Sequence, residues 1–337
     1  MMSENLDKIA KKVLKYPHVV GYAKTLQKRQ KDGKILKEWV LQVHVSKKVS
    51  EKELRINDII PKEIDEIPID VVQIGSLQAP PPGKLETQTK KTETIRPLVA
   101  GISIGNATIT AGTLGWFMEK TISPDKGEIF LASNAHVFSE EPKNEGSVEK
   151  RIYQPGVYDG GSETVAEYYW HKKLYAVGES ECGIAKNIAS FLNAMAEVFG
   201  SGTRLVPVTQ EINNIDFAVA RPSVPYELRF FDVELPPEKF RFVGLGFAGS
   251  DQVSIVCKQK YISMQGYTPI NYEGIDVSVG NILHKTGRTS CYGQAKVLVE
   301  SAFETVSYGV YTVIFDDVIL TENMLSPGDS GSAVWRE

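Results

Sequence analysis

The sequence predicts a mainly β protein, in which a body of two β-barrels with one helical insert follows a small α+β domain. Three observations support this fold class. The chain has 337 residues, which is enough for a small domain and a two-barrel body. Short apolar segments separated by glycine-containing turns fill the sequence from residue 98 onward, a pattern typical of a barrel or sandwich. The first 75 residues instead combine one helical repeat with a hairpin pattern.

The helical repeat lies at the start of the N-terminal domain. Apolar residues recur there at three- and four-residue steps over 3–16, which predicts one helix that ends before Pro17. Two strand-like segments follow, Val19–Gln27 and Ile35–Val45, and they flank an Asp-Gly pair. Because this pair favours the positive φ angles of a tight turn, the two segments are expected to form a hairpin.

A third strand near Ile69–Ile74 completes this domain, which we predict to span residues 1–75. His44 falls on the more polar side of the second strand, where we expect an ordinary strand residue and not a ligand. The stretch 76–97 is rich in proline, threonine and lysine and has few bulky apolar residues. This composition predicts an exposed linker between the two parts of the chain.

One helix is predicted inside the β-rich body, as an insert within residues 182–205. Its apolar residues share one helical face, and a Gly-Ser-Gly sequence at 200–202 marks its end. The residues on that face are Ile184, Ile188, Phe191, Leu192, Met195 and Val198. We expect them to face a core.

Composition excludes several classes of protein and partner. Hydrophobic residues make up 42% of the chain and charged residues 24%, values typical of a globular protein. A formal net charge of -4 gives no reason to expect nucleic acid as a partner. The sequence has no signal-peptide pattern and no apolar run of membrane-spanning length, so no membrane association and a cytoplasmic location are expected. The sequence leaves open whether the chain forms homo-oligomers.

The three cysteines, Cys182, Cys257 and Cys291, are widely spaced and form no CxxC pair. They predict neither a disulfide scaffold nor a structural metal site, and no cofactor is expected. A cysteine hydrolase built on Cys291 is a remote alternative, because no glycine turn flanks this residue.

The first chemical motif is a Gly-Asp-Ser-Gly-Ser sequence around Ser330. A serine that attacks an acyl group must lie on a tight turn where its hydroxyl is exposed and backbone N–H groups converge. Glycines on both sides permit such a turn. We therefore predict Ser330 as a nucleophile, with an oxyanion hole formed by the backbone N–H groups of Gly328 and Ser330.

A serine nucleophile needs a base and a group that orients the base. His136 follows the apolar strand that ends near Ala132 and is flanked by small residues. Asp216 precedes the apolar sequence Phe-Ala-Val-Ala, where a carboxylate is held rigidly at the start of a strand. The order His136, Asp216, Ser330 matches the chymotrypsin class of triad and differs from the subtilisin and α/β-hydrolase orders.

Together these motifs resemble those of the trypsin-like (chymotrypsin-class) serine peptidases, over roughly residues 98–337. Three further stretches are similar to the intracellular prokaryotic branch related to the plant narrow-leaf protein: Thr110 through Gly161, the insert within 182–205, and Lys285–Thr289. The resemblance implies a two-barrel chymotrypsin-like fold and a serine endopeptidase that acts on peptide or protein substrates without a cofactor or metal.

The sequence departs from this family after the nucleophile. The family continues with a β-hairpin that binds substrate, whereas only seven residues follow Ser330 here. A segment of that character occurs earlier, at 242–257. We interpret the second barrel as circularly permuted; truncation of the chain after residue 337 is the alternative. Permutation would let Phe247, Ala248 and Gly249 offer a strand edge to the substrate.

The resemblance also implies a residue at the floor of the specificity pocket, six positions before the nucleophile. Met324 stands there, which predicts an apolar residue on the amino side of the cleaved bond. Asp329 stands next to the predicted nucleophile, at the position whose aspartate pairs with a new N-terminal amine in activated trypsins. No activation site adjoins the predicted barrel, so we do not expect activation of that kind.

The sequence therefore predicts a serine endopeptidase. Two alternatives remain: a catalytically silent peptide-binding module on the same fold, and a scaffold protein whose N-terminal domain carries the function. Labelling of the nucleophile distinguishes the first from an enzyme. Deletion of the N-terminal domain tests the second.

Overall fold

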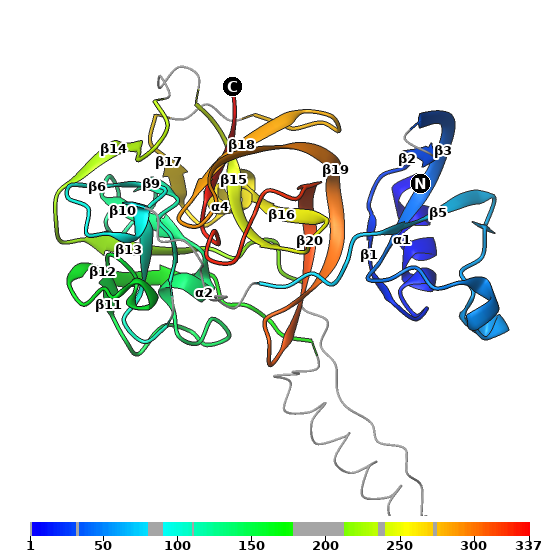
Figure 1. The fold of residues 1–337 in the computed structure, drawn as a ribbon, viewed down its shortest axis with the longest axis horizontal. Coiled ribbons are helices and arrows are strands. Elements are labelled where there is room, and N and C mark those ends of the chain that lie inside the picture. The colour runs from blue at the N-terminus through cyan, green and yellow to red at the C-terminus, as the bar shows by residue number, and fades with distance from the viewer. Residues whose placement is uncertain are drawn as a thin grey trace, which may run out of the picture.

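The computed structural model describes residues 2–31, 34–79, 90–109, 111–177, 212–234, 240–271 and 275–337. It is mainly β, with curled antiparallel sheets that are consistent with the predicted two-barrel chymotrypsin-like fold (Figure 1). The helix predicted within 182–205 lies outside the described residues. No helix within the described ranges is long and apolar enough to cross a bilayer.

An eight-stranded sheet forms the first barrel, in the order β17-β9-β10-β13-β12-β11-β7-β8. Its strands are β7 (Ser103–Asn106), β8 (Gly112–Thr113), β9 (Trp116–Lys120), β10 (Ile129–Ser133), β11 (Arg151–Tyr153), β12 (Thr164–His171), β13 (Ala218–Pro222) and β17 (Tyr267–Pro269). The backbone between β8 and β9 connects the two ends of this curled sheet. The N–H of Leu114 donates to the carbonyl of Ile102, just before β7, and the N–H of Gly115 donates to the carbonyl of Ala132 in β10, each at 2.9 Å.

Short elements surround this barrel. Helix α2 (Ala135–Phe138) follows β10, and the 3-10 turn η4 (Val157–Asp159) precedes β12. A separate parallel pair joins β6 (Leu98–Ala100) to β14 (Tyr226–Phe230). The core of the barrel continues into the second barrel, because Trp116, Phe230 and Trp335 belong to one buried aromatic cluster.

The second barrel is closed by six strands that pair in a ring, β18-β21-β15-β16-β20-β19, with β19 pairing back to β18. They are β15 (Arg241–Gly249), β16 (Val253–Lys258), β18 (Ile282–Gly287), β19 (Cys291–Ser307), β20 (Thr312–Glu322) and β21 (Ala333–Arg336); helix α4 (Gln259–Met264) follows β16. The last strand, β21, lies between β18 and β15. Strand β15 pairs with the last strand, and β16 pairs with the other edge of β15. The circular permutation of this barrel stays a prediction.

The N-terminal elements extend the same sheet. They are α1 (Met2–Val13), β1 (Val19–Ala23), β2 (Gln27–Lys31), β3 (Lys34–Val45), η1 (Glu51–Glu53), η2 (Ile56–Asp58), β4 (Glu63–Ile64) and β5 (Ile67–Gln73). Strand β1 pairs antiparallel with β19, placing Gly21 opposite Glu304, and β3 and β5 continue the sheet outward (Figure 1). The predicted strand Val19–Gln27 is shorter in the structure, since β1 ends at Ala23 and a second strand, β2, begins at Gln27. Both strands pair with β3, and β1 also pairs with β19.

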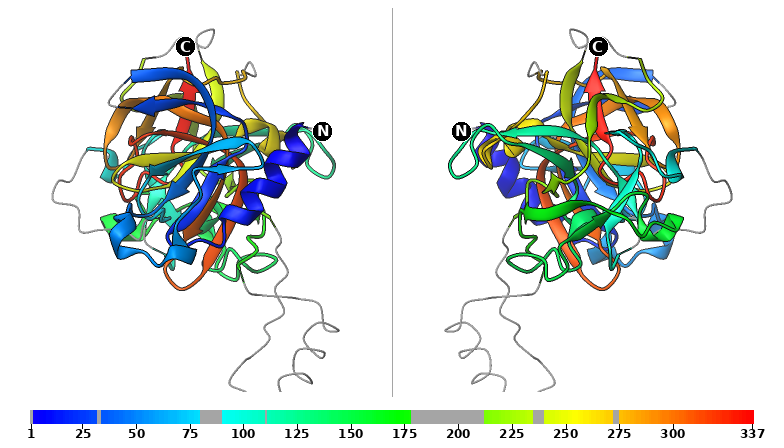
Figure 2. Two further views of the ribbon diagram at one scale, coloured as in Figure 1. Left: turned by 90° about the vertical axis from the view of Figure 1, so that its right-hand side faces the viewer. Right: turned by 90° about the vertical axis from the view of Figure 1, so that its left-hand side faces the viewer.

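Helix α1 crosses one face of this extension (Figure 2). Its residues Ile9, Ala10 and Val13 are fully buried in a cluster that also contains Phe303 and Ile314 from the second barrel. The hydrophobic core of the N-terminal elements thus includes side chains of the body. The division of the chain into residues 1–75 and 98–337 stays a prediction.

His44, on the more polar side of β3, is buried: its Nδ1 atom pairs with the carboxylate of Glu304, and both side chains are buried. Gly21 of β1 lies opposite each of these two residues and has no side chain to separate them. The described ends of the predicted linker are only partly exposed: Leu77, Ala79, Lys91 and Thr92 have exposed fractions of 7% or less, whereas Ser76, Gln78, Lys90, Glu93 and Thr94 are exposed. Lys91 lies in the 3-10 turn η3 (Lys90–Thr92) and pairs with Asp232 at 2.7 Å.

Candidate active site

The structure brings His136 and Asp216 together at the ends of two paired strands. Strand β10 runs antiparallel to β13, with Ser133 opposite Ala218. His136 lies on α2 just beyond the end of β10, and Asp216 lies two residues before β13. Their side chains therefore meet, and His136 Nδ1 lies 2.5 Å from Asp216 Oδ2. This is the contact that orients a histidine base for proton transfer.

Asp216 is fully buried and has three further hydrogen-bond contacts around it. The backbone N–H of Ala135 donates to Oδ1 at 2.5 Å, and the hydroxyl of Tyr308 donates to Oδ2 at 2.7 Å. The Asn134 side chain donates to the Asp216 backbone carbonyl. Burial alone would raise the pKa of Asp216, but His136 and the two donors outweigh it and hold the pKa below its usual value. The carboxylate is thereby kept ionised.

Tyr308 was not found from the sequence. It lies just beyond the end of β19, far from both other residues in the chain, and its ring packs edge-on against His136 with centroids 5.6 Å apart. Burial and the adjacent carboxylate raise the pKa of Tyr308 well above its usual value, so the hydroxyl remains a donor. No local motif marks such a residue, because its role depends on a contact across two barrels.

Ser330 lies on the predicted tight turn that precedes β21. Gly328 and Gly331 on its two sides both have φ of +92°, a conformation that favours glycine. A Cβ atom at Gly331 would overlap the Ser133 hydroxyl and the Thr113 carbonyl, so this turn approaches the first barrel closely. The backbone N–H of Thr113 donates to the Ser330 carbonyl at 2.8 Å. The turn that carries Ser330 is thus fixed between the two barrels.

In this structure the Ser330 hydroxyl donates to the carbonyl of Phe247 at 3.3 Å. The Nε2 atom of His136 is buried and has no hydrogen-bond partner among the described residues. The serine-to-histidine hydrogen bond is therefore not formed at rest. Such bonds are often long in substrate-free enzymes and tighten when substrate binds. The contact with Phe247 also shows that the segment 242–257 lies beside Ser330.

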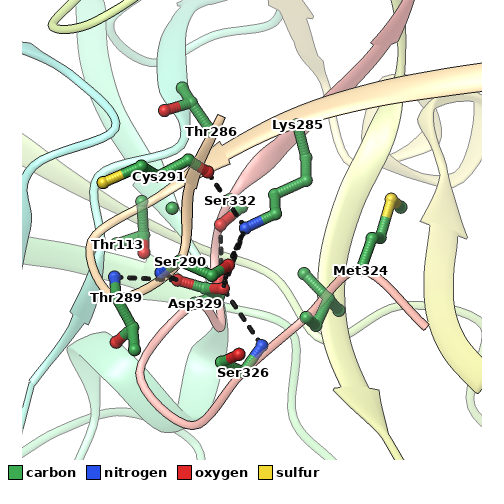
Figure 3. A network of polar contacts seen from close by, with 12 residues as sticks. Thr113, Lys285, Thr286, Thr289, Ser290, Cys291, Met324, Ser326, Asp329 and Ser332 are labelled. Carbon is green, nitrogen blue, oxygen red and sulfur yellow. Dashed lines mark hydrogen bonds and ion pairs between the residues drawn. The ribbon is translucent and has the colours of Figure 1, made fainter. Parts of the chain in front are cut away.

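A second buried ion pair stabilises the backbone of this turn (Figure 3). Lys285 on β18 donates to Asp329 Oδ2 at 2.9 Å, and neither side chain is exposed. The carboxylate of Asp329 also accepts backbone N–H bonds from Thr289, Ser290 and Ser326, at 2.9, 3.1 and 3.0 Å. Burial would raise the pKa of Asp329, yet Lys285 and Ser290 outweigh it, so the pKa lies below its usual value.

This network leaves the backbone N–H groups of Gly328 and Ser330 without an acceptor within the described part of the chain. The two predicted oxyanion donors are thus available in a turn that Lys285 holds from within. Lys285 stands in the stretch Lys-Thr-Gly-Arg-Thr that supported the family resemblance, but its pairing with Asp329 was not predicted. Lys285 lies two residues after Leu283, on the same buried face of β18, and this position is a local signal.

Arg288 links the same turn to the first barrel. Its guanidinium pairs with Asp159, with Nε 2.8 Å from Oδ2, and its backbone N–H donates to the hydroxyl of Thr113 at 3.0 Å. Both charged side chains are almost completely buried. The Thr113 hydroxyl in turn donates to the carbonyl of Gly328 at 3.0 Å. These contacts fix the position of Gly328, one of the two predicted oxyanion donors, relative to both barrels.

A cavity of about 480 Å³ adjoins Ser330. Its lining includes the three predicted edge residues, which are Phe247, Ala248 and Gly249. Met324, predicted at the pocket floor, does not line this cavity; it packs in a separate cluster with Val243 and Val256. Its neighbours Asn323 and Leu325 line the cavity instead. Alternate residues of an extended chain face opposite ways, which is why the two neighbours of Met324 border this cavity and Met324 does not. The pocket role of Met324 stays a prediction.

The described residues contain no cluster of three or more metal-ligating side chains. Cys257 is buried and Cys291 partly buried, and both are free thiols. Burial raises the pKa of Cys257 to about 12, which makes its thiolate inaccessible at neutral pH.

No family model matches the chain, and no curated protein matches it significantly. Among solved structures, it is similar to a Nocardiopsis protease, with 11% identity and a TM-score of 0.32, over 71% of this chain and 91% of that chain. It is also similar to a glutamic-acid-specific serine protease, with 13% identity and a TM-score of 0.31, over 71% of this chain and 92% of that one.

Proposed function

We propose that the chain is a serine endopeptidase that hydrolyses peptide bonds through His136, Asp216 and Ser330. The observation that carries this proposal is the joint geometry of three parts: a histidine paired with a buried carboxylate, a serine on a glycine turn, and two free backbone donors beside that serine. Acyl transfer requires all three parts together.

In the proposed reaction, His136 Nε2 takes the proton of the Ser330 hydroxyl while Oγ attacks the carbonyl carbon of the substrate. The oxyanion that forms accepts hydrogen bonds from the N–H groups of Gly328 and Ser330. His136 then gives the proton to the leaving amine, and an acyl ester remains on Ser330. A water molecule, deprotonated by His136, hydrolyses this ester and releases the acid. Asp216 holds the histidine tautomer and stabilises its charged form.

The substrate is proposed to be a peptide or protein chain in extended conformation. The edge formed by Phe247, Ala248 and Gly249 borders the cavity beside Ser330, as an added substrate strand requires. The side chain on the amino side of the cleaved bond would then be selected by Asn323 and Leu325.

The test is labelling with a fluorophosphonate probe, followed by peptide mapping. We expect the probe on Ser330 of the folded protein and no labelling of the Ser330→Ala variant. The unpaired Nε2 atom of His136 favours one alternative, a silent peptide-binding module on the same fold. A folded wild-type protein that resists the probe would support that alternative and contradict the enzyme.

A further inference from the structure

The segment Leu77–Ala79 forms a short strand against the end of β15. The N–H of Gln78 donates to the carbonyl of Gly249 at 3.0 Å, and the N–H of Gly249 donates to the carbonyl of Gln78 at 3.0 Å. On its other side the segment pairs with Ser307: Ala79 donates to its carbonyl at 2.8 Å, and Ser307 donates to the carbonyl of Leu77 at 2.9 Å. The segment is therefore hydrogen-bonded along both edges.

The edge that Gln78 uses is the edge proposed for the substrate. Gly249 lies two residues beyond Phe247, whose carbonyl contacts the Ser330 hydroxyl. Main-chain groups of alternate strand residues point the same way. In a substrate paired with this edge, one residue contributes the attacked carbonyl. The residue two positions before it would then form its backbone hydrogen bonds with Gly249. Both hydrogen bonds that Gly249 offers there are already made to Gln78.

We propose that Leu77–Ala79 is a built-in occupant of the substrate edge, a pseudosubstrate strand that a peptide must displace before cleavage. This inference rests on the proposed peptidase function. It goes beyond that function in two ways. It names the residues that occupy the substrate edge in the absence of substrate, and it states that small reagents reach Ser330 more easily than peptide-sized reagents do.

The side chains of the strand follow the pattern of a bound extended peptide. Leu77 and Ala79 are buried, with exposed fractions of 2% and 7%, whereas Ser76 and Gln78 are exposed. Ser76 and Gln78 border the cavity that contains Ser330. Ala79 borders the neighbouring cavity that contains His136. The strand therefore runs from the side of the nucleophile toward the histidine, along the path of a substrate.

The sequence after Ala79 explains why this strand is an occupant and not a good substrate. Three prolines follow it, at positions 80–82. A proline has no backbone N–H and cannot donate to the carbonyl of Phe247, as an ordinary substrate residue would. The residue that follows Ala79 therefore lacks the backbone N–H that the proposed site requires of a substrate.

The experiment compares two variants at one position. Gln78→Pro removes the N–H that donates to Gly249, whereas Gln78→Ala changes only an exposed side chain and is the matched control. Each protein is labelled with two reagents: a small fluorophosphonate, and an equimolar set of succinyl-Ala-Ala-Ala-X diphenyl phosphonates in which X is Ala, Val, Leu, Phe, Lys or Glu. Rate constants for modification of Ser330 are measured by mass spectrometry.

We expect the ratio of peptidyl to small-reagent rate constants to rise about tenfold in Gln78→Pro, the effect of one lost hydrogen bond, and to stay unchanged in Gln78→Ala. An unchanged ratio in Gln78→Pro overturns the pseudosubstrate strand while leaving the peptidase intact. Failure of the small reagent to label the folded wild type overturns the proposed function itself. If Gln78→Pro does not fold, Leu77→Gly, which removes a buried anchor but no donor, is judged by the same ratio.

Discussion

Replacing Lys285 by methionine tests whether an internal ion pair holds the nucleophile turn in place. The substitution keeps a similar apolar stem and leaves the buried carboxylate of Asp329 without its cation. Breaking a buried pair in this way typically costs about 3 to 5 kcal/mol of unfolding free energy. Because three backbone N–H groups and the Ser290 hydroxyl still bond to Asp329, we expect a loss near the lower end, about 3 kcal/mol.

The measurement is urea unfolding at neutral pH of the wild type, Lys285→Met, Asp329→Asn and the double variant. We expect the double variant to lose less than the sum of the two single losses, since it contains no unpaired charge. Fluorophosphonate labelling of Lys285→Met should also slow, because the oxyanion donors adjoin Asp329. A loss below about 1 kcal/mol together with wild-type labelling would refute the reasoning that Lys285 organises this turn.

The same pair predicts a pH dependence. The pKa of Asp329 is lower in the folded protein than in the unfolded chain, so its contribution to stability is present above the unfolded pKa of about 4. That contribution is lost as the pH falls through the lower, folded value. The wild type should therefore lose stability on acidification below about pH 4, and Lys285→Met should lose less over the same range. Unfolding curves between pH 7 and pH 2 measure this difference.

Three further predictions follow from the buried contacts. Asp216→Asn should slow modification of Ser330 by fluorophosphonate about 10⁴-fold, because an amide stabilises the wrong histidine tautomer, while circular dichroism shows a folded protein. Tyr308→Phe should cost about 1 kcal/mol of unfolding free energy in urea, because one hydrogen bond to the buried Asp216 carboxylate is lost; an unchanged unfolding free energy would contradict this role. His44→Leu should cost about 3 to 5 kcal/mol in thermal or urea unfolding, and adding Glu304→Leu should restore much of that loss; a further loss would show that the pair does not act as a unit.

Local sequence patterns predicted the parts of the site that a single strand end or turn determines. His136 and Asp216 each stand at the end of an apolar strand, and the structure joins those two strands in one sheet. The glycines around Ser330 predicted a tight turn, and both have positive φ angles. In each case the required conformation depends on neighbouring residues in the chain, so the sequence carries the signal locally. Their catalytic roles stay predictions.

The parts that were not predicted depend on contacts between distant segments. Tyr308 reaches Asp216 only because the turn after β19 extends over the first barrel, and 92 residues separate the two in sequence. His44 and Glu304 are 260 residues apart, and neither position is marked by composition. The segment 76–97 contains polar residues and prolines, yet Leu77 and Ala79 are buried by strands that come much later in the chain. The periodicity of apolar residues shows only which face of a helix or strand is buried. It therefore cannot show which distant segment covers that face.

Strand β19 connects the N-terminal elements to the proposed catalytic carboxylate. Glu304 on this strand pairs with His44 and lies opposite Gly21, and three residues later Ser307 pairs with Leu77–Ala79. The next residue, Tyr308, donates to Asp216. These contacts lie within five consecutive residues of one backbone. The N-terminal elements and the proposed pseudosubstrate strand thus bind the same stretch of chain that leads to Tyr308, which places them in physical contact with the proposed chemistry.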